Sequence, residues 1–302
     1  MRFTKMHGAG NDYIYLDCTK LSLSKPSELA IRLSDRHTGI GGDGLILIYP
    51  SEAADFRMEM YNSDGSLGNM CGNGIRCVAK FVYDKKLTDK KVLMVETASG
   101  IKHLVLHMGK DDMVSHVTVD MGKPALEAVK IPTTLRERPI DELFERCSPN
   151  ASAALSASGN SGSAVRAGIE ILGKNYEVTC VSVGNPHAVV FLQDDVDTLD
   201  LEKIGPHFER HTSFPDRVNT EFVNVIDRGH LKMRVWERGS GETMACGTGT
   251  CAVLVAGIMN GHCDMASDIL TRGGVMNNRW DMESGGVFMT GPAATVFEGD
   301  VE

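Results

Sequence analysis

Clustered lysine and arginine residues are missing from this sequence. The 302 residues carry 40 acidic and 31 basic side chains, for a formal net charge of -9. A nucleic-acid-binding protein needs clusters of positive charge to neutralise phosphates. The composition therefore argues against nucleic acid as a partner and favours a small polar substrate.

The N-terminal segment has no apolar run of the length that a signal-peptide core or a membrane span requires. Its first residues, MRFTKMHGAGNDYIYLD, alternate apolar with polar and charged side chains. We therefore expect a cytoplasmic protein without membrane association. A hydrophobic content of 42% over 302 residues is enough for a large core and predicts two domains.

The eight cysteines include no CxxC pair. Without an export signal, a disulfide framework is not expected. Cys71 and Cys77 are separated by five residues, which is not a spacing of zinc ligands, so no metal is expected. Most free cysteines behave as small buried hydrophobic residues. We predict this role for Cys18, Cys147, Cys180 and Cys263.

Two parts of the chain begin alike. Gly10 and Asn11 precede the strand-like YIYLD, whereas Gly184 and Asn185 precede Pro186, His187 and the strand-like AVVFL. Asn11 lies 60 positions before a cysteine motif, and Asn185 lies 61 positions before a second one. Because Gly-Asn pairs are common in loops, one such match carries little weight, but the matches continue in order.

The two cysteine motifs are themselves similar. CGNGIRC begins at Cys71 and CGTGTC at Cys246, and each is followed by an apolar, helix-like run. Asn62 lies nine positions before Cys71, as Glu237 does before Cys246. Taken together, these matches indicate an internal duplication.

The duplication predicts where the domains lie. We place the first domain at 1–122, rejoined by 292–302, and the second at 123–291, with its matching part starting near 176. The unmatched stretch near 130–170 contains ASAALSASGNSGSA (151–164), whose composition predicts a flexible surface insertion without chemistry.

Apolar periodicity predicts mostly short strands with few helices. Helices are expected at 27–37, 74–84 and 249–260, and strands at 45–49, 56–61, 92–96, 114–119 and 231–236. This pattern predicts an α+β fold of two similar domains, each a mostly antiparallel sheet wrapped around a central helix.

Cys71 and Cys246 are the strongest candidates for chemistry. Each stands just before a glycine-rich helix start, where backbone N–H groups and the helix dipole favour an anion. Such a position stabilises a thiolate, and the glycines at 72, 74, 247 and 249 let a substrate carboxylate approach the backbone. A pair of thiols on opposite sides of one carbon supplies the base and the acid that inversion of a stereocentre needs.

His187 and Glu237 are candidates for tuning the thiols. His187 follows the duplicated Gly-Asn, and Glu237 precedes Cys246 at the duplicated offset. The competing interpretations are a buried structural histidine at 187 and a solvated carboxylate at a strand end at 237.

Five motifs together resemble the diaminopimelate epimerase family: KMHGAGNDY, NSDGSLGNMCGNGIRC, VSVGNPH, RVNTEF and ERGSGETMACGTGTC. The resemblance covers nearly the whole chain and implies two domains related by pseudo-twofold symmetry. It also implies interconversion of LL- and meso-2,6-diaminopimelate, in lysine and peptidoglycan precursor synthesis, without pyridoxal phosphate or another cofactor. A homodimer is compatible with this family.

The same resemblance implies roles for individual residues. Cys71 is the base toward the L centre and Cys246 the acid, with the roles exchanged in the reverse direction. His187 and Glu237 match positions that tune the thiols. The reacting carboxylate is held by Gly72, Asn73, Gly247 and Thr248, and the rest of the substrate by Asn11, Asn62, Asn185, Asn219, Glu237 and Arg238.

Two departures and several rival interpretations accompany this assignment. Some family members carry glutamine where this chain has Gly44, and the insertion near 130–170 is longer than the family pattern predicts.

GIGGDG (39–44) fits a dinucleotide fingerprint, but a helix-like segment precedes it and a strand-like one follows, the reverse of the required order. A dithiol redox protein, a binding module without catalysis and a proline racemase or hydroxyproline epimerase are rival hypotheses. Proline racemases and hydroxyproline epimerases carry MCGHG where this chain has MCGNG.

Overall fold

The computed structural model describes residues 1–135 and 164–301. The chain forms two compact units, one of Met1–Asp120 with Thr290–Glu302 and the other of Met121–Met289. Most of the insertion predicted near 130–170, namely residues 136–163 with Cys147, lies outside the described residues.

Unit 1 is a sheet that encloses one helix and carries a second helix outside. Strand β1 (Arg2–Gly8) pairs with β18 (Ala294–Asp300) and with β2 (Asn11–Asp17). The sheet continues through β3 (Gly44–Tyr49), β4 (Phe56–Asn62), β6 (Val92–Thr97), β7 (Gly100–Met108) and β8 (Val114–Asp120), with β5 (Leu67–Gly68) beside β4. Only the β2–β3 and β4–β6 pairs among these are parallel.

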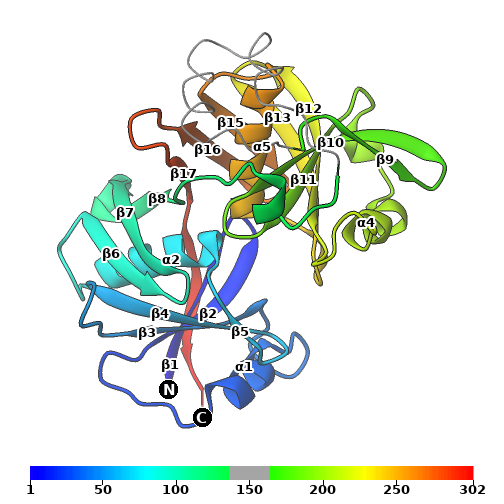
Figure 1. Cartoon of the computed structure of the whole chain (residues 1–302). Coiled ribbons are helices and arrows are strands. Elements are labelled where there is room, and N and C mark those ends of the chain that lie inside the picture. Colours follow the sequence, from blue (N-terminus) through cyan, green and yellow to red (C-terminus); the bar gives the residue numbers. More distant parts are fainter. Residues whose placement is uncertain (136–163, 302) are drawn as a thin grey trace. The chain divides into compact units, whose positions relative to one another are not determined.

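Helix α2 (Gly72–Asp84) is the central helix of unit 1 and contacts β1, β2, β7 and β8 (Figure 1). Helix α1 (Pro26–Ser34) packs on the other face, where Ala30 and Leu33 join Ile14, Leu16 and Leu45 in one buried cluster. The two faces of β2 thus serve different helices, as the two-residue period of a strand requires.

Unit 2 repeats this plan with different residues. Its sheet runs through β9 (Ala167–Ile171), β10 (Lys174–Ser182), β11 (Pro186–Phe191), β12 (Asn219–Asp227), β13 (His230–Glu237), β15 (Ala266–Thr271) and β16 (Gly274–Trp280), with β14 (Gly241–Thr243) beside β13. Strand β17 (Val287–Pro292) leads from unit 2 into unit 1. The parallel pairs are β11–β12 and β13–β15, at the places that correspond to those of unit 1.

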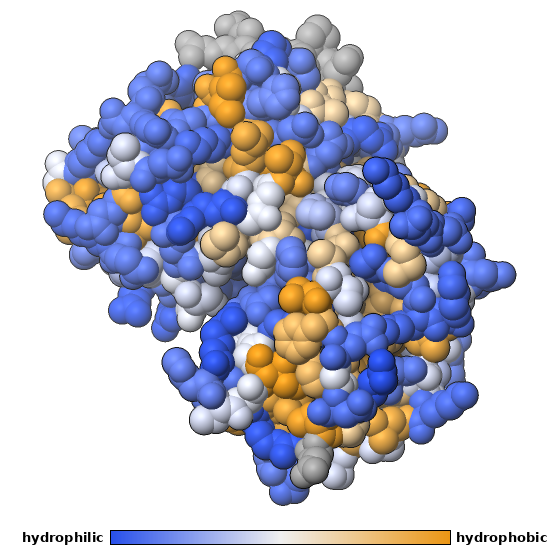
Figure 2. Space-filling model, turned by 180° about the vertical axis from the view of Figure 1, so that it is seen from behind, coloured by the Kyte–Doolittle hydropathy of each residue, from blue (hydrophilic) through white to orange (hydrophobic). Residues whose placement is uncertain are grey.

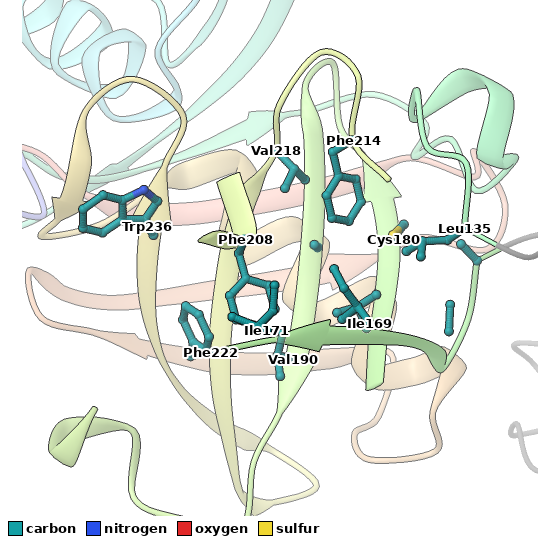
Figure 3. Close-up of a cluster of buried hydrophobic side chains, with 14 of the residues drawn as sticks. Leu135, Ile169, Ile171, Cys180, Val190, Phe208, Phe214, Val218, Phe222 and Trp236 are labelled. Carbon is teal, nitrogen blue, oxygen red and sulfur yellow. The ribbon is translucent and has the colours of Figure 1, made fainter. Parts of the chain in front are cut away.

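Helix α5 (Gly247–Met259) is the central helix of unit 2, and all but one of its residues are buried. Helix α4 (Leu201–Glu209) covers the opposite face of the sheet, over a cluster that includes Phe208, Phe222 and Trp236 (Figure 3). The rings of Phe208 and Phe222 meet edge to face with centroids 5.2 Å apart, a favourable arrangement for aromatic pairs.

The α+β fold with a central helix in each part is confirmed, as are the three helices and five strands predicted from periodicity. Helix α4 was not predicted. Gly205 and Pro206 lie inside it, and both residues are unfavourable in helix interiors. The helix forms nevertheless, because Leu201 and Phe208 are buried against the sheet.

The burial predicted for the cysteines outside the two cysteine motifs is confirmed for those that the structure describes. Cys18, Cys180 and Cys263 are at most 3% exposed. Burial raises the pKa of Cys18 to about 11 and that of Cys180 to about 12. These thiols stay protonated at neutral pH, so they do not compete with the candidate pair as bases.

Candidate active site

The candidate residues fall into two groups, one in each unit. We call Asn11, Asn62, Cys71, Gly72 and Asn73 the N half-site. The C half-site comprises Asn185, His187, Asn219, Glu237, Arg238, Cys246, Gly247 and Thr248.

Strand ends bring the N half-site together. The antiparallel β4 ends at the side of the sheet where β2 and β3 begin, because Tyr13 pairs with Gly44 and Gly44 with Asn62. Asn11 is the first residue of β2 and Asn62 the last of β4. The side chain of Asn62 bonds to Ser66 Oγ at 2.9 Å, within the turn that leads to β5.

Cys71 is the N-cap residue of α2. Its backbone is extended, and its sulfur accepts a hydrogen bond from the Gly74 N–H at 3.3 Å. The thiol donates to Asn11 Oδ1 at 3.1 Å. A cysteine that caps a helix in this way lies where the unpaired N–H groups of the first turn favour negative charge. Cys77 lies further along the same helix, where burial raises its pKa to about 11.

Asp43 fixes the orientation of the Asn11 amide. Its Oδ2 accepts from Asn11 Nδ2 at 2.7 Å and from the Asp12 N–H at 3.1 Å, while Arg36 bonds to its Oδ1 at 2.9 Å. With its nitrogen held by a carboxylate, the amide must present its oxygen to Cys71. Asp43 was not among the predicted residues, although it lies within GIGGDG (39–44).

Tyr13 occupies the space that a side chain at position 44 would need. A Cβ atom on Gly44 would lie 2.9 Å from Tyr13 Cε1 and 2.1 Å from the carbonyl oxygen of Tyr61. The Tyr13 ring is 5% exposed. Burial raises the pKa of its hydroxyl well above the usual value, and the nearby Cys71 raises it further. A phenol whose pKa is raised therefore stands beside the Cys71 thiol.

The C half-site is assembled at the corresponding strand ends. Asn185 precedes β11, Asn219 begins β12 and Glu237 ends β13. Asn219 Oδ1 accepts from the Arg238 N–H at 2.8 Å, which ties the ends of β12 and β13 together. The Arg238 guanidinium is exposed and donates to the carbonyl oxygen of Asp216 at 2.8 Å.

Cys246 is the N-cap residue of α5, as Cys71 is of α2, but its surroundings differ. Its side chain makes no capping bond to the helix and lies 3.4 Å from Thr248 Oγ1. Burial raises the pKa of the Cys246 thiol well above its usual value, and the charges of Glu237 and Glu221 raise it further.

His187 and Glu237 both stand in the C half-site. His187 is fully buried, with Nδ1 2.7 Å from Glu221 Oε1 and Nε2 3.0 Å from Asn185 Oδ1. Glu237 is half-buried and accepts a hydrogen bond from Thr243 Oγ1. Burial raises the pKa of Glu237, although bonds to Thr243 and Cys246 and the charge of His187 lower it. Glu221 was also not predicted, although it lies within the motif RVNTEF.

Among the described residues, no group of His, Cys, Asp and Glu side chains could hold a metal ion. No helix in the described part of the chain is both long and apolar enough to cross a membrane. The surface in Figure 2 is largely hydrophilic, with apolar residues in separate groups.

Comparison with solved structures identifies the fold class of the chain. A PhzF-family phenazine biosynthesis protein from Bacillus anthracis matches with a TM-score of 0.66 and 14% identity, covering 100% of this chain and 99% of that one. A hydroxyproline epimerase from Agrobacterium vitis matches with a TM-score of 0.63 and 15% identity, covering 100% and 90%. The fold is that of the PhzF and proline-racemase-like proteins.

The sequence narrows this class to one family. The family model for diaminopimelate epimerase matches residues 3–127 and 179–296. A diaminopimelate epimerase of Acetivibrio thermocellus is 51% identical over 100% of this chain and 99% of its own length. One from Methanococcus maripaludis is 48% identical over the full length of both chains. The chain belongs to the diaminopimelate epimerase family, and it is an isomerase.

Proposed function

We propose that this protein interconverts LL- and meso-2,6-diaminopimelate, in lysine and peptidoglycan precursor synthesis, by proton transfer between two cysteines. One repeated observation carries this proposal. In each unit a cysteine is the N-cap of the central helix, and other candidate residues of its half-site lie at neighbouring strand ends. Membership of the family supports the choice of substrate.

The proposed reaction exchanges one proton for another at the α-carbon. The thiolate of Cys71 removes the α-proton, so that a C–H bond breaks and an S–H bond forms. Cys246 gives its thiol proton to the opposite face, so that its S–H bond breaks and a new C–H bond forms. In the reverse direction the roles exchange. The raised pKa of Cys246 supports its part as the acid in the first direction.

The negative charge that develops on the substrate needs fixed hydrogen-bond donors. We assign the reacting carboxylate to the first N–H groups of α2 and α5, at Gly72, Asn73, Gly247 and Thr248, because helix N-termini bind anions. The amides of Asn11, Asn62, Asn185 and Asn219, with Glu237 and Arg238, are assigned to the rest of the substrate. A diamino diacid offers both signs of charge for such a polar set.

Proton NMR in deuterated water tests this function. LL-diaminopimelate incubated with the enzyme should lose its α-proton signal as deuterium enters, while the meso isomer accumulates. A binding module would cause no exchange. A dithiol redox protein would instead reduce a disulfide substrate, and a proline racemase would exchange the α-proton of proline. We further propose a cytoplasmic location and a homodimeric state, which fractionation and sedimentation would check.

Arg238→Lys should lower kcat/KM for diaminopimelate by about 10-fold or more. A guanidinium pairs with a carboxylate through two parallel hydrogen bonds, and an ammonium group cannot reproduce this geometry. Steady-state kinetics should show the loss mainly as a higher KM. Arg228→Lys is the matched control, because Arg228 is an exposed arginine of the same unit that bonds to Asp264. Equal kinetics for Arg238→Lys and wild type would remove Arg238 from the substrate site.

Asp43→Asn should lower kcat/KM by about 10- to 100-fold. The carboxylate holds the Asn11 amide by a charge-assisted bond of roughly 1.5–3 kcal/mol, and without it the amide can turn its nitrogen toward Cys71. Asp35→Asn is the control, because Asp35 lies in the same loop and bonds to the N–H groups of His37 and Thr38. If both variants lose activity equally, the loop as a whole and not the amide orientation is responsible.

A further inference from the structure

Glu221 is a buried carboxylate that the reaction described above does not use. Its side chain is fully buried, Oε1 lies 2.7 Å from His187 Nδ1, and Oε2 has no hydrogen-bond partner among the described residues. Taking a carboxylate out of water costs several kcal/mol unless its partners compensate. A group with one oxygen left unsatisfied therefore needs a reason beyond packing.

The matching position of unit 1 shows that packing alone does not require a carboxylate at position 221. In unit 1, Tyr13 pairs with Gly44, and Ile46 stands two residues further along β3. In unit 2, His187 pairs with Asn219, and Glu221 stands two residues further along β12.

The two side chains touch corresponding helix positions. Ile46 Cδ1 lies 2.6 Å from where a Cβ on Gly74 would be, and Glu221 Oε1 lies 2.7 Å from the same point on Gly249. Each glycine is three residues after its cysteine. An isoleucine fills the space against the first turn of α2, whereas the chain places a charged group against the first turn of α5.

We propose that Glu221 is a positioning residue, whose carboxylate accepts the Nδ1–H of His187 and so fixes the ring and its tautomer within the C half-site. The other ring nitrogen, Nε2, lies 3.0 Å from Asn185 Oδ1. Because an unprotonated Nε2 and an amide oxygen are both acceptors, this contact requires either a second proton on the ring or an Asn185 amide turned so that its nitrogen faces Nε2. A carboxylate behind a histidine sets the tautomer in this way in many sites, because the bond to one nitrogen determines what the other can do. The inference deepens the proposed function, since it concerns the surroundings of Cys246.

The carboxylate also affects the thiol. The charged groups that act on Cys246 come from two strands, Glu237 from β13 and Glu221 from β12. His187 of β11 contacts Glu221 and acts on Glu237. Burial raises the pKa of the Cys246 thiol, and the charges of Glu237 and then Glu221 add to this. Removing the charge of Glu221 should therefore lower the pKa of the Cys246 thiol and make it a stronger acid.

The first measurement is the tautomer of His187 in the intact protein. Proton–nitrogen correlation spectra of the ¹⁵N-histidine-labelled enzyme, assigned with a His187→Asn variant, should show a protonated Nδ1 in the wild type. Glu221→Gln should change this signal. A wild-type spectrum with an unprotonated Nδ1 would overturn the proposal without any need for a variant.

The second measurement is the reaction of Cys246 with iodoacetamide as a function of pH, read for this cysteine alone by peptide mass spectrometry. Glu221→Gln should move the midpoint to lower pH, so that alkylation at a fixed pH becomes at least several-fold faster. Asp84→Asn is the matched control. It removes a buried carboxylate that binds Lys80 at 2.6 Å, at the far end of α2 and in the other unit.

The outcomes separate this proposal from the proposed function. An unchanged alkylation profile and His187 signal, together with a loss of stability, would mean that Glu221 is only structural. If Glu221→Gln does not fold, Glu221→Asp tests the same bond, because it withdraws the carboxylate by one methylene. If both shifts appear but the wild type does not epimerise diaminopimelate, Glu221 keeps its positioning role and the proposed function fails.

Discussion

Replacing either Cys71 or Cys246 by alanine is expected to abolish epimerisation. Each thiol is assigned one of the two proton transfers, and the next cysteine along each central helix cannot take its place: Cys77 is buried with a pKa of about 11, and Cys251 is fully buried. A general acid or base contributes typically 10²- to 10⁴-fold to the rate, so residual turnover should be below about 1% of the wild type.

Conversion of LL- to meso-diaminopimelate, followed by chiral chromatography, measures the loss. Cys18→Ala and Cys263→Ala are matched controls, because they remove buried thiols outside the two half-sites. Circular dichroism should show that all four variants fold. Turnover above about a tenth of the wild type in either active-site variant would be too high for a lost general acid or base, and the two-thiol assignment would be wrong.

Gly205→Ala is expected to destabilise the protein through a clash with the ring of Trp236. A Cβ on Gly205 would lie 2.2 Å from Trp236 Cδ2 and 2.5 Å from Cγ. The indole cannot easily move away, because its Nε1 donates to the buried Glu209 at 2.8 Å and its ring lies beside the cluster around Phe208 (Figure 3). Overpacking of this kind costs about 1–3 kcal/mol.

The loss should appear as a lower midpoint in urea unfolding. Trp236 precedes Glu237 and Arg238, so the KM for diaminopimelate should also rise. Gly168→Ala is the control, because nothing lies within 4 Å of a Cβ at that position, and its stability should stay within about 0.5 kcal/mol of the wild type. A Gly205→Ala midpoint equal to that of the control would mean that α4 can shift away from the sheet without cost.

The sequence by itself determined the features that depend on local pattern. Strand and helix periodicities identified the α+β fold, since the period of apolar residues follows the backbone geometry of each element. The duplicated spacings marked Cys71 and Cys246, and both cap the central helix of their unit. A glycine-rich start followed by an apolar run is a local signal, so it could be recognised without knowing any contact.

The tertiary structure decided what joins residues far apart in the chain. Asp43 holds Asn11 across 32 positions, and Glu221 holds His187 across 34. The spacing of these residues along the chain does not show that pairing between parallel strands brings the two members of each pair into contact. Helix α4 also forms against its own sequence preference, because burial of Leu201 and Phe208 outweighs the cost of Gly205 and Pro206. The cysteines are therefore set by local sequence, but their electrostatic surroundings are set by strand pairing.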